Sequence, residues 1–584
     1  MAFDVVTASY QEREKVRSPL VHALRAGLTM GGVTIFLAAV GIVRQFNERW
    51  IIADVLTLGQ FALGFCALVA GVLVARKTKA VNAAAATLQG LIAGATAAGI
   101  LSLLVLIMSE VKLRFMFVAL SKPLFNILTF KLGTFGGIAV LIACGATLGL
   151  LGALLYVTPA RYRRPIVTAL SAVALVGLFQ ELIQLMIQRE GILSAIRETF
   201  FTWDGLSLQG AILVALIALG VKSLWMWRRE RIVTRYHGLP TGQQKTVRVS
   251  MTLVGMLVFL LIPLAAGNFI GQVFLLVGLY VLMGYGLNLE LGLCGLLDLG
   301  FVAFFAIGAY TTALLTADSP VSIANWSFWE ALPVAVVLSL IVGVIFGVPV
   351  LKVRGDYLAV ATLGLGEIVR VLVLSDFAGP VFGGAQGILN IPRPHIGDFA
   401  IDNPVKLFYL TVILCGIVAF IAWRLQYSRL GRAWTAIRDD EDVAQALGIN
   451  LINCKLLAYG LGAAFCGVAG AIFGVMLGSI FPHSFQLLIS INVLALIIVG
   501  GLGSLPGVAL GAAALIGLPE LLREFGEFRF LFYGMTIVAM MRLKPEGLWP
   551  SESVKRERHS LEVTQAEVEA ELHGETAASE KPAE

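Results

Sequence analysis

The chain has 584 residues, of which 58% are hydrophobic and only 14% are charged. A soluble domain carries about 25% charged residues, so this composition excludes an ordinary soluble protein and indicates a chain surrounded by lipid. The net charge of +6 does not indicate a nucleic-acid-binding face, because the Lys and Arg residues gather in short segments between apolar runs.

Apolar runs long enough to cross a bilayer recur along the first part of the chain. About 20 apolar residues in a helix cross the hydrocarbon core. The predicted spans lie at about 27–43, 50–74, 84–108, 134–157, 166–187 and 208–226. The basic loops between them fall on one side, which the positive-inside rule assigns to the cytoplasm together with the N-terminus. The segment 109–133 conflicts with this topology, because it would face outward and yet carries four basic residues. It is expected to lie in the interface or to add a helix.

The second part of the chain continues the pattern, and the predicted fold is an all-α, polytopic transmembrane helical bundle. The further spans lie at about 250–268, 270–288, 293–316, 330–351, 356–374, 405–426, 456–480, 488–501, 506–518 and 529–542. We expect an N-terminal membrane extension at 1–248, ending in a basic cytoplasmic linker, and a core at 249–550. The polar, Glu-rich tail 551–584 is expected to be disordered or weakly helical in the cytoplasm.

Signatures of soluble enzymes fail on inspection. The stretch GLPTGQQKT from Gly238 resembles a phosphate-binding loop but lacks the Gly-Lys pair at the required spacing. The six histidines are scattered and form no ligand pair. The six cysteines fall mostly in apolar runs without CxxC spacing, which favours helix packing. We therefore predict no catalytic residue, no metal site and no cofactor.

Charged residues inside the predicted spans are the first candidates for function. A charged side chain at the bilayer centre costs about 2.5–3.5 kcal/mol on insertion scales, so such residues are seldom retained without a reason. Glu290 and Arg370 are expected near helix ends, where their side chains can extend to the interface. Asp298 and Glu367 are expected where the bundle meets a polar pathway, and Glu181 is a further intramembrane acid.

Glycine clusters predict breaks in membrane helices at Gly292–Gly300, Gly383–Gly387 and Gly500–Gly507. Unwound backbone is tolerated in a membrane only where protein or a water-filled cavity satisfies it, and half-helix N-termini at such breaks attract carboxylates in transporters. The alternative is close helix packing through small residues. That alternative is preferred for Gly460, Gly462, Gly467, Gly470 and Gly474.

The polar loop from Ser428 to Leu456 differs from its neighbours because it is long, predicted to be cytoplasmic and helical in its middle. Basic residues extend to Arg438, and the acids that follow suit the N-terminus of a short helix. Small residues then give a close-contact surface, and a glycine ends the helix. The candidate partner-binding residues are Arg438, Asp439, Asp440, Glu441, Asp442, Ala444, Ala446 and Gly448.

Several long stretches resemble, in order, the LivM-like permease subunits of ATP-binding-cassette importers for branched-chain amino acids. They are Gly292–Leu315, Val348–Leu372, Gly383–Ile391, the polar loop and Ala495–Ala512. In the loop, the sequence from Asp442 to Gly448 resembles a degenerate Glu-Ala-Ala-x-x-x-Gly motif, which docks the ATPase subunits. The resemblance implies pairing with a second homologous permease, two cytoplasmic ATP-binding subunits and a periplasmic or surface amino-acid-binding protein. The extension 1–248 lies outside it.

The predicted function is the permease subunit of such an importer, which moves leucine, isoleucine, valine or related hydrophobic L-amino acids across the bacterial inner membrane and is not itself an enzyme. The pathway candidates are Asp298, Phe301, Phe304, Phe305, Glu367, Gly383, Gly384 and Gly387. Three alternatives stay open. They are an ion-coupled carrier with Asp298, Glu367 and Glu181 as a relay, an amide or urea importer of the same family and, least favoured, a membrane-embedded enzyme.

Overall fold

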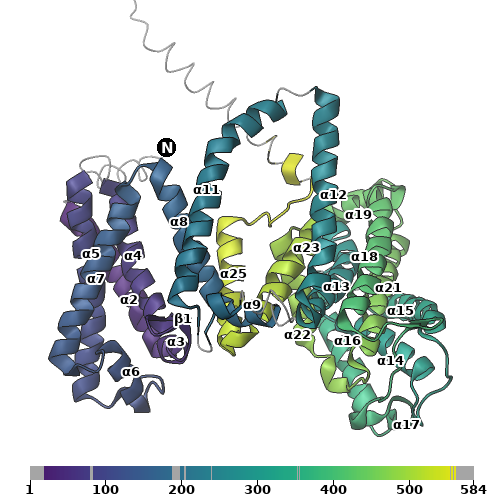
Figure 1. Ribbon diagram of the computed structural model, residues 1–584. Coiled ribbons are helices and arrows are strands. Elements are labelled where there is room, and N and C mark those ends of the chain that lie inside the picture. The colour runs from purple at the N-terminus through teal and green to yellow at the C-terminus, as the bar shows by residue number, and fades with distance from the viewer. Residues whose placement is uncertain are drawn as a thin grey trace, which may run out of the picture. The chain divides into compact units, whose positions relative to one another are not determined.

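The computed structural model describes residues 19–78, 83–186, 197–202, 205–237, 240–350, 353, 355–552, 554–556, 558 and 560. Its contacts divide the chain into two units, Met1–Gly255 and Met256–Glu584, and each is described here by itself (Figure 1). The N-terminal residues before 19, Gly238 of the phosphate-loop-like stretch and the tail beyond 560 lie outside the described residues.

The first unit is a bundle of apolar helices with one small hairpin. Its elements are α2 (Pro19–Val40), α3 (Ile42–Phe46), β1 (Trp50–Ile52), β2 (Leu56–Thr57), α4 (Leu58–Thr78), α5 (Ala83–Glu110), α6 (Lys122–Leu128), α7 (Gly133–Val157), α8 (Ala160–Leu178), α9 (Gln180–Met186), α11 (Leu208–His237) and most of α12 (Thr241–Ala266). Helices α2, α4, α5 and α7 pack on one another, and α8 packs on α11. Glycine permits the closest of these contacts, because a Cβ on Gly94 of α5 would overlap the carbonyl oxygen of Gly145 in α7.

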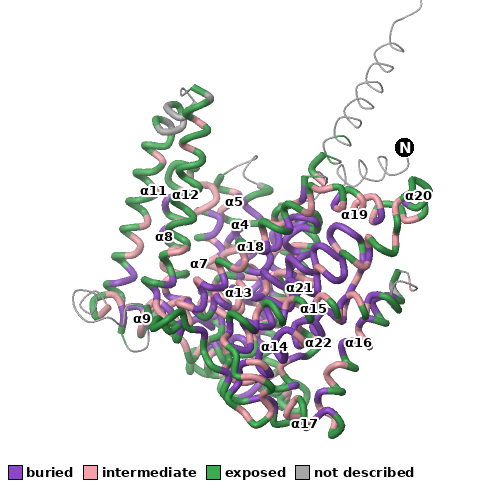
Figure 2. The backbone as a smooth tube through the Cα atoms, turned by 90° about the vertical axis from the view of Figure 1, so that its right-hand side faces the viewer, coloured by how far each residue is buried: buried purple, intermediate pink, exposed green. Residues whose placement is uncertain are grey.

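The second unit is larger and better buried. Its elements after α12 are α13 (Asn268–Leu287), a π-helical turn (Asn288–Leu293), α14 (Val302–Thr316), α15 (Phe328–Val350), α16 (Asp356–Leu374), α17 (Gly379–Phe382), β3 (His395–Ile396), β4 (Phe399–Ala400), α18 (Pro404–Gln426), α19 (Arg429–Asp439), α20 (Glu441–Ala446), α21 (Leu451–Leu477), α22 (Leu487–Gly500), α23 (Leu505–Ala512), a second π-helical turn (Ala513–Gly517), α24 (Leu518–Leu521) and α25 (Phe528–Leu543). Helix α21 packs against α13, α14 and α15, and Figure 2 shows it mostly buried.

The expected close packing of the α21 glycines is confirmed. A Cβ on Gly470 would overlap the carbonyl oxygen of Phe305, and a Cβ on Gly467 would overlap the hydroxyl of Ser339 in α15. These glycines let the α21 backbone approach its neighbours to a distance at which no side chain fits. The packing of α14 and α15 against α21 therefore depends on them.

Twelve of the described helices are long and apolar enough to cross a membrane, which confirms the all-α polytopic bundle. The predicted span 166–187 differs, because α8 ends at Leu178 and α9 begins at Gln180. The predicted span 293–316 is also shorter, since its helix begins only at Val302. In the segment 109–133, α5 ends at Glu110 and α7 begins at Gly133. The 3₁₀ turn Leu113–Phe115 and the short helix α6 lie between them, and Phe115 is 92% exposed.

Candidate functional site

An unwound segment interrupts the second unit between α13 and α14. The π-helical turn ends at Leu293, and the chain runs without regular structure until α14 begins at Val302. The predicted break at Gly292–Gly300 is therefore present. Its freed amides find side-chain acceptors on other helices, which unwound backbone in a membrane requires. Leu299 N–H donates to Thr362 Oγ1 of α16 at 3.0 Å, and Val302 N–H donates to Ser490 Oγ of α22 at 2.9 Å.

A second break lies beside the first. Helix α22 ends at Gly500 and α23 begins at Leu505, so the predicted break at Gly500–Gly507 is also present. Gly503 N–H donates to Asn288 Oδ1 in the π-helical turn at 2.9 Å, and Gln426 Nε2 of α18 donates to the Gly503 carbonyl at 3.1 Å. Asn288 thus joins the two breaks into one structure.

The third glycine cluster is a loop between helices and not a break within one. Gly383, Gly384 and Gly387 all have positive φ angles, of 77°, 53° and 67°, which favour glycine. They lie between α17 and the bridge that pairs Ile388 with Ile480. Figure 1 shows α17 at the end of the second unit opposite to α19.

Two buried acids lie at the first break. Glu290 is 0% exposed and Asp298 is 1% exposed, so the expectation that Glu290 extends to the membrane surface is wrong. Glu290 is held inside because it lies in the π-helical turn, where its carboxylate packs against Gly462 of α21. Asp298 Oδ1 accepts from Gly300 N–H at 2.6 Å and so supports the unwound backbone. Tyr459 of α21 completes this buried polar group, which we call the acid cluster.

The predicted phenylalanines belong to the packed interior. Phe301, Phe304 and Phe305 are all buried. The Phe304 ring meets the Tyr459 ring edge-on with centroids 5.4 Å apart, and Phe305 packs against Phe473 at 4.9 Å. These contacts fix α14 against α21, and they leave the rings no exposed face toward a substrate.

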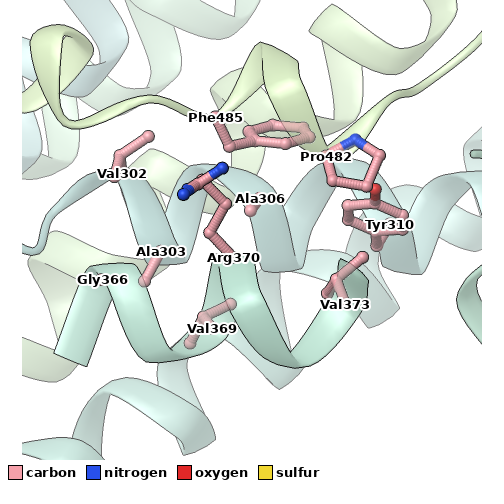
Figure 3. A pocket seen from close by; sticks show the side chains of 10 residues that line it. All are labelled: Val302, Ala303, Ala306, Tyr310, Gly366, Val369, Arg370, Val373, Pro482 and Phe485. Carbon is pink, nitrogen blue, oxygen red and sulfur yellow. The ribbon is translucent and has the colours of Figure 1, made fainter. Parts of the chain in front are cut away.

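An ion pair lies in the C-terminal half of α16, where Arg370 is near the helix end as expected. Arg370 Nε donates to Glu367 Oε2 at 3.0 Å, and the Glu367 side chain is 47% exposed on the surface of this chain. Figure 3 shows Arg370 pointing into a small cavity of about 10 Å³ between α14, α16 and the segment at Pro482. Tyr310 of α14 also lines this cavity. The pair therefore presents charge at the surface of a helix whose other residues are mainly apolar.

The polar loop forms the two short helices α19 and α20. Asp440 caps α20, because its Oδ1 accepts from the N–H groups of Asp442 and Val443, both at 2.9 Å. Trp434 anchors α19, since it is fully buried and its Nε1 donates to the Cys454 carbonyl at 2.8 Å. Lys455 of α21 pairs with Glu441 at 2.6 Å. These contacts hold α19 and α20 in place, and we call the two helices together the platform.

The exposed surface of α20 and its C-cap includes two apolar residues outside the predicted candidate set. Val443 is 54% exposed and Leu447 is 76% exposed, beside exposed Asp442. Asp439, Ala446 and Gly448 are also exposed, whereas Ala444 is buried within this chain and serves its packing. An apolar pair on a capped polar helix was a signal available in the sequence.

Arg438 connects the platform to the first break. Its Nη1 donates to the Gly292 carbonyl at 2.8 Å, and a Cβ on Gly295 would lie only 2.9 Å from Arg438 Cγ. Gly295 has a φ angle of +78°, so the backbone turns where Arg438 crosses it. Arg438 therefore places α19 in direct contact with the unwound segment.

Comparison with known proteins agrees with this architecture. The sequence pattern of a family described as branched-chain amino acid transport system / permease component matches residues 269–541. The high-affinity branched-chain amino acid transport system permease protein LivM of Escherichia coli is 36% identical over 336 residues, which cover 53% of this chain and 77% of that protein. This chain belongs to the branched-chain amino acid transport permease family.

A second LivM is equally similar, and the related permease LivH is more distant. LivM of Salmonella typhimurium has the same identity and coverage as that of Escherichia coli, whereas LivH of Salmonella typhimurium is 23% identical over 291 residues, which cover 47% of this chain and 93% of that protein. No solved structure matches. The family region extends from α13 to α25, so it contains both breaks, the acid cluster and the platform.

Proposed function

We propose that the chain is the transmembrane permease subunit of an ATP-binding-cassette importer for leucine, isoleucine, valine or related hydrophobic L-amino acids. Family membership supports the transport role, and the contact of Arg438 with the first break supports a mechanism in which α19 and α20 transmit force. In this proposal ATP is hydrolysed by two separate cytoplasmic subunits, and the chain lies in the bacterial inner membrane with both termini in the cytoplasm. The division at 248 and 550 stays a prediction.

The proposed assembly also contains a second homologous permease and a periplasmic or surface amino-acid-binding protein. LivM and LivH are both named as branched-chain amino acid transport system permease proteins, which supports a pair of related permeases. The Glu367–Arg370 ion pair supports α16 as the place where the two permeases meet. A charged side chain exposed to hydrocarbon is costly, so the α16 face that bears the pair is better placed against a partner or a water-filled path.

In this arrangement the substrate passes along the exposed face of α16. Glu367 and Arg370 offer opposite charges to the ammonium and carboxylate of an amino acid, and the Gly383–Gly387 loop lies at the outer end of the path. Asp298 is buried within the chain, where it holds the first break in its unwound form. The three phenylalanines act through packing.

Neutralising one member of the α16 ion pair is expected to lower amino acid uptake at least tenfold, because the remaining charge loses its partner inside the membrane. We expect this for Glu367→Gln and for Arg370→Gln, and partial recovery for the exchange Glu367→Arg with Arg370→Glu. The effect of each substitution is measured as uptake of radiolabelled leucine by vesicles that contain the complete transporter. Asp402→Asn is the matched control, since Asp402 pairs with Lys406 at 2.7 Å on an exposed loop. Equal uptake by wild type and both single variants would contradict the proposed path.

Charge on the exposed face of α20 is expected to abolish binding of the ATPase subunits. Asp442→Arg combined with Leu447→Arg reverses one charge and removes an exposed apolar contact, while the buried side of α20 stays intact. Co-purification of the ATPase subunits with the full chain is the measurement. Leu389→Arg, a half-exposed position in the connection between α16 and α18, is the control. Undiminished co-purification and uptake in the double variant would remove the docking assignment.

The source of energy for uptake distinguishes the proposed importer from an ion-coupled carrier. We expect uptake to follow ATP and to survive an uncoupler while ATP is maintained. Collapse of uptake under those conditions would favour the carrier.

A further inference from the structure

A cavity of about 740 Å³ lies between α8 and α11 in the first unit. From α8 it is lined by Arg161, Tyr162 and Ile166, among others, and from α11 by Leu219, Ser223 and Trp227. The two helices pack directly on each other, as Figure 1 also shows. Its volume is within the range of about 300–1,000 Å³ that is usual for small-molecule sites. Neither the transport proposal nor the family region, which begins at residue 269, assigns this cavity a role.

The walls of the cavity change from polar to apolar along the helices. Tyr162 and Trp227 are both exposed, and aromatic rings of this kind gather at the level of lipid headgroups. Ile166 and Leu219 follow further along the two helices, and exposed Leu170 continues the apolar surface along α8. This order of side chains matches the order of groups in a phospholipid.

Positive charge surrounds the headgroup end. Arg161 lines the cavity, Arg164 lies about one turn further along α8, and exposed Arg228 and Arg229 follow Trp227. Within the described part of the chain, no carboxylate lies within 4 Å of any of these guanidinium groups. Arg163 differs, because its Nη1 donates to the Tyr156 carbonyl at 3.0 Å. The cavity thus combines an aromatic rim, an apolar floor and cations that lack an acidic partner among those residues.

We propose that this cavity binds an anionic phospholipid. The headgroup phosphate lies at Arg161 and Arg164, and one acyl chain follows Ile166 and Leu219. Basic pockets between membrane helices on the cytoplasmic side are suited to such headgroups, and each Lys or Arg near the surface contributes about 1 kcal/mol. The site is independent of the transported substrate, so failure of the transport proposal leaves it intact.

Binding of phosphatidylglycerol to the delipidated full chain in detergent tests the site, with native mass spectrometry as the readout. Phosphatidylcholine with the same acyl chains is the zwitterionic comparison. Arg161→Gln combined with Arg164→Gln is expected to weaken phosphatidylglycerol binding roughly tenfold to thirtyfold, from the contribution of two guanidinium groups. Arg76→Gln combined with Lys77→Gln is the matched control, because it removes the same charge from the exposed end of α4 and is expected to change nothing.

A steric variant keeps the test independent of charge. Ser223→Trp fills the cavity from α11, leaves every arginine in place and is expected to remove the bound lipid. Elution of each variant as a single species in size-exclusion chromatography shows that it has folded. Equal losses in the two double variants would attribute binding to surface charge in general and overturn the site. Equal affinity for phosphatidylcholine, or displacement by inorganic phosphate alone, would also overturn it.

Discussion

Replacement of Arg438 by alanine is expected to separate ATP hydrolysis from transport. In the proposed importer the ATPase subunits grip α20, and Arg438 is the residue of α19 that bonds to the first break, through Gly292 O at 2.8 Å. Arg438→Ala removes that bond and the packing of the side chain on Gly295, while Trp434 and Asp440 still hold the platform. The complex is expected to assemble and hydrolyse ATP, whereas uptake falls at least tenfold.

Parallel assays of the reconstituted transporter measure both activities, and uptake per ATP hydrolysed is the decisive quantity. Arg432→Ala is the control, because Arg432 is exposed on α19 and its Nη1 donates to the Tyr427 carbonyl at 3.4 Å, within the same segment. Arg438→Lys retains a cation that can still bond to Gly292 O, so it is expected to give an intermediate ratio. A wild-type ratio in Arg438→Ala would show that force reaches the break by another route.

Replacement of Gly470 by alanine is expected to be the most destabilising single-methyl change in α21. The new Cβ would overlap the carbonyl oxygen of Phe305 and lie 2.8 Å from the backbone nitrogen of Ala309. Both are backbone atoms of α14, so relief requires the helices to separate. Overpacking of this kind costs about 1–3 kcal/mol, and the separation would also loosen Phe305 from Phe473.

Thermal unfolding of the full chain, followed by fluorescence-detected size-exclusion chromatography, measures the change. Gly416→Ala is the matched control, because Gly416 lies within α18 and a Cβ there would meet no atom within 4 Å. That control is expected to hold or slightly raise the unfolding temperature, since alanine is the better helix former. Unfolding temperatures that agree between the two variants would mean that α14 and α21 are not held by this contact.

Hydropathy predicted the membrane bundle because the signal for a span is long and local. Hydropathy overestimated the length of a span where polar residues interrupt the apolar run. Polar Gln180 and Glu181 follow immediately on Phe179, and α8 ends before them at Leu178. The glycines at 292 and 500 did mark true breaks, since few other residues tolerate such close backbone approaches.

The candidate site was only partly predictable, because its geometry depends on residues far apart in the chain. Glu290 lies near a helix end in sequence, yet Gly462 provides the space that keeps it buried. Phe305 carries an apolar ring suited to a substrate, but that ring packs against Phe473 and Phe485 in the interior. A single sequence shows which residues are polar within a span, and it does not show which helix satisfies them.

The bond between Val302 N–H and Ser490 Oγ also sets an order of events during synthesis. The two residues are 188 positions apart, so the amide at the start of α14 is made long before its acceptor exists. At about 5–20 residues per second this interval lasts roughly 10–40 s. During that time α14 depends on water, lipid headgroups or the insertion machinery for a partner. The first break therefore acquires its final form only when α22 enters the membrane.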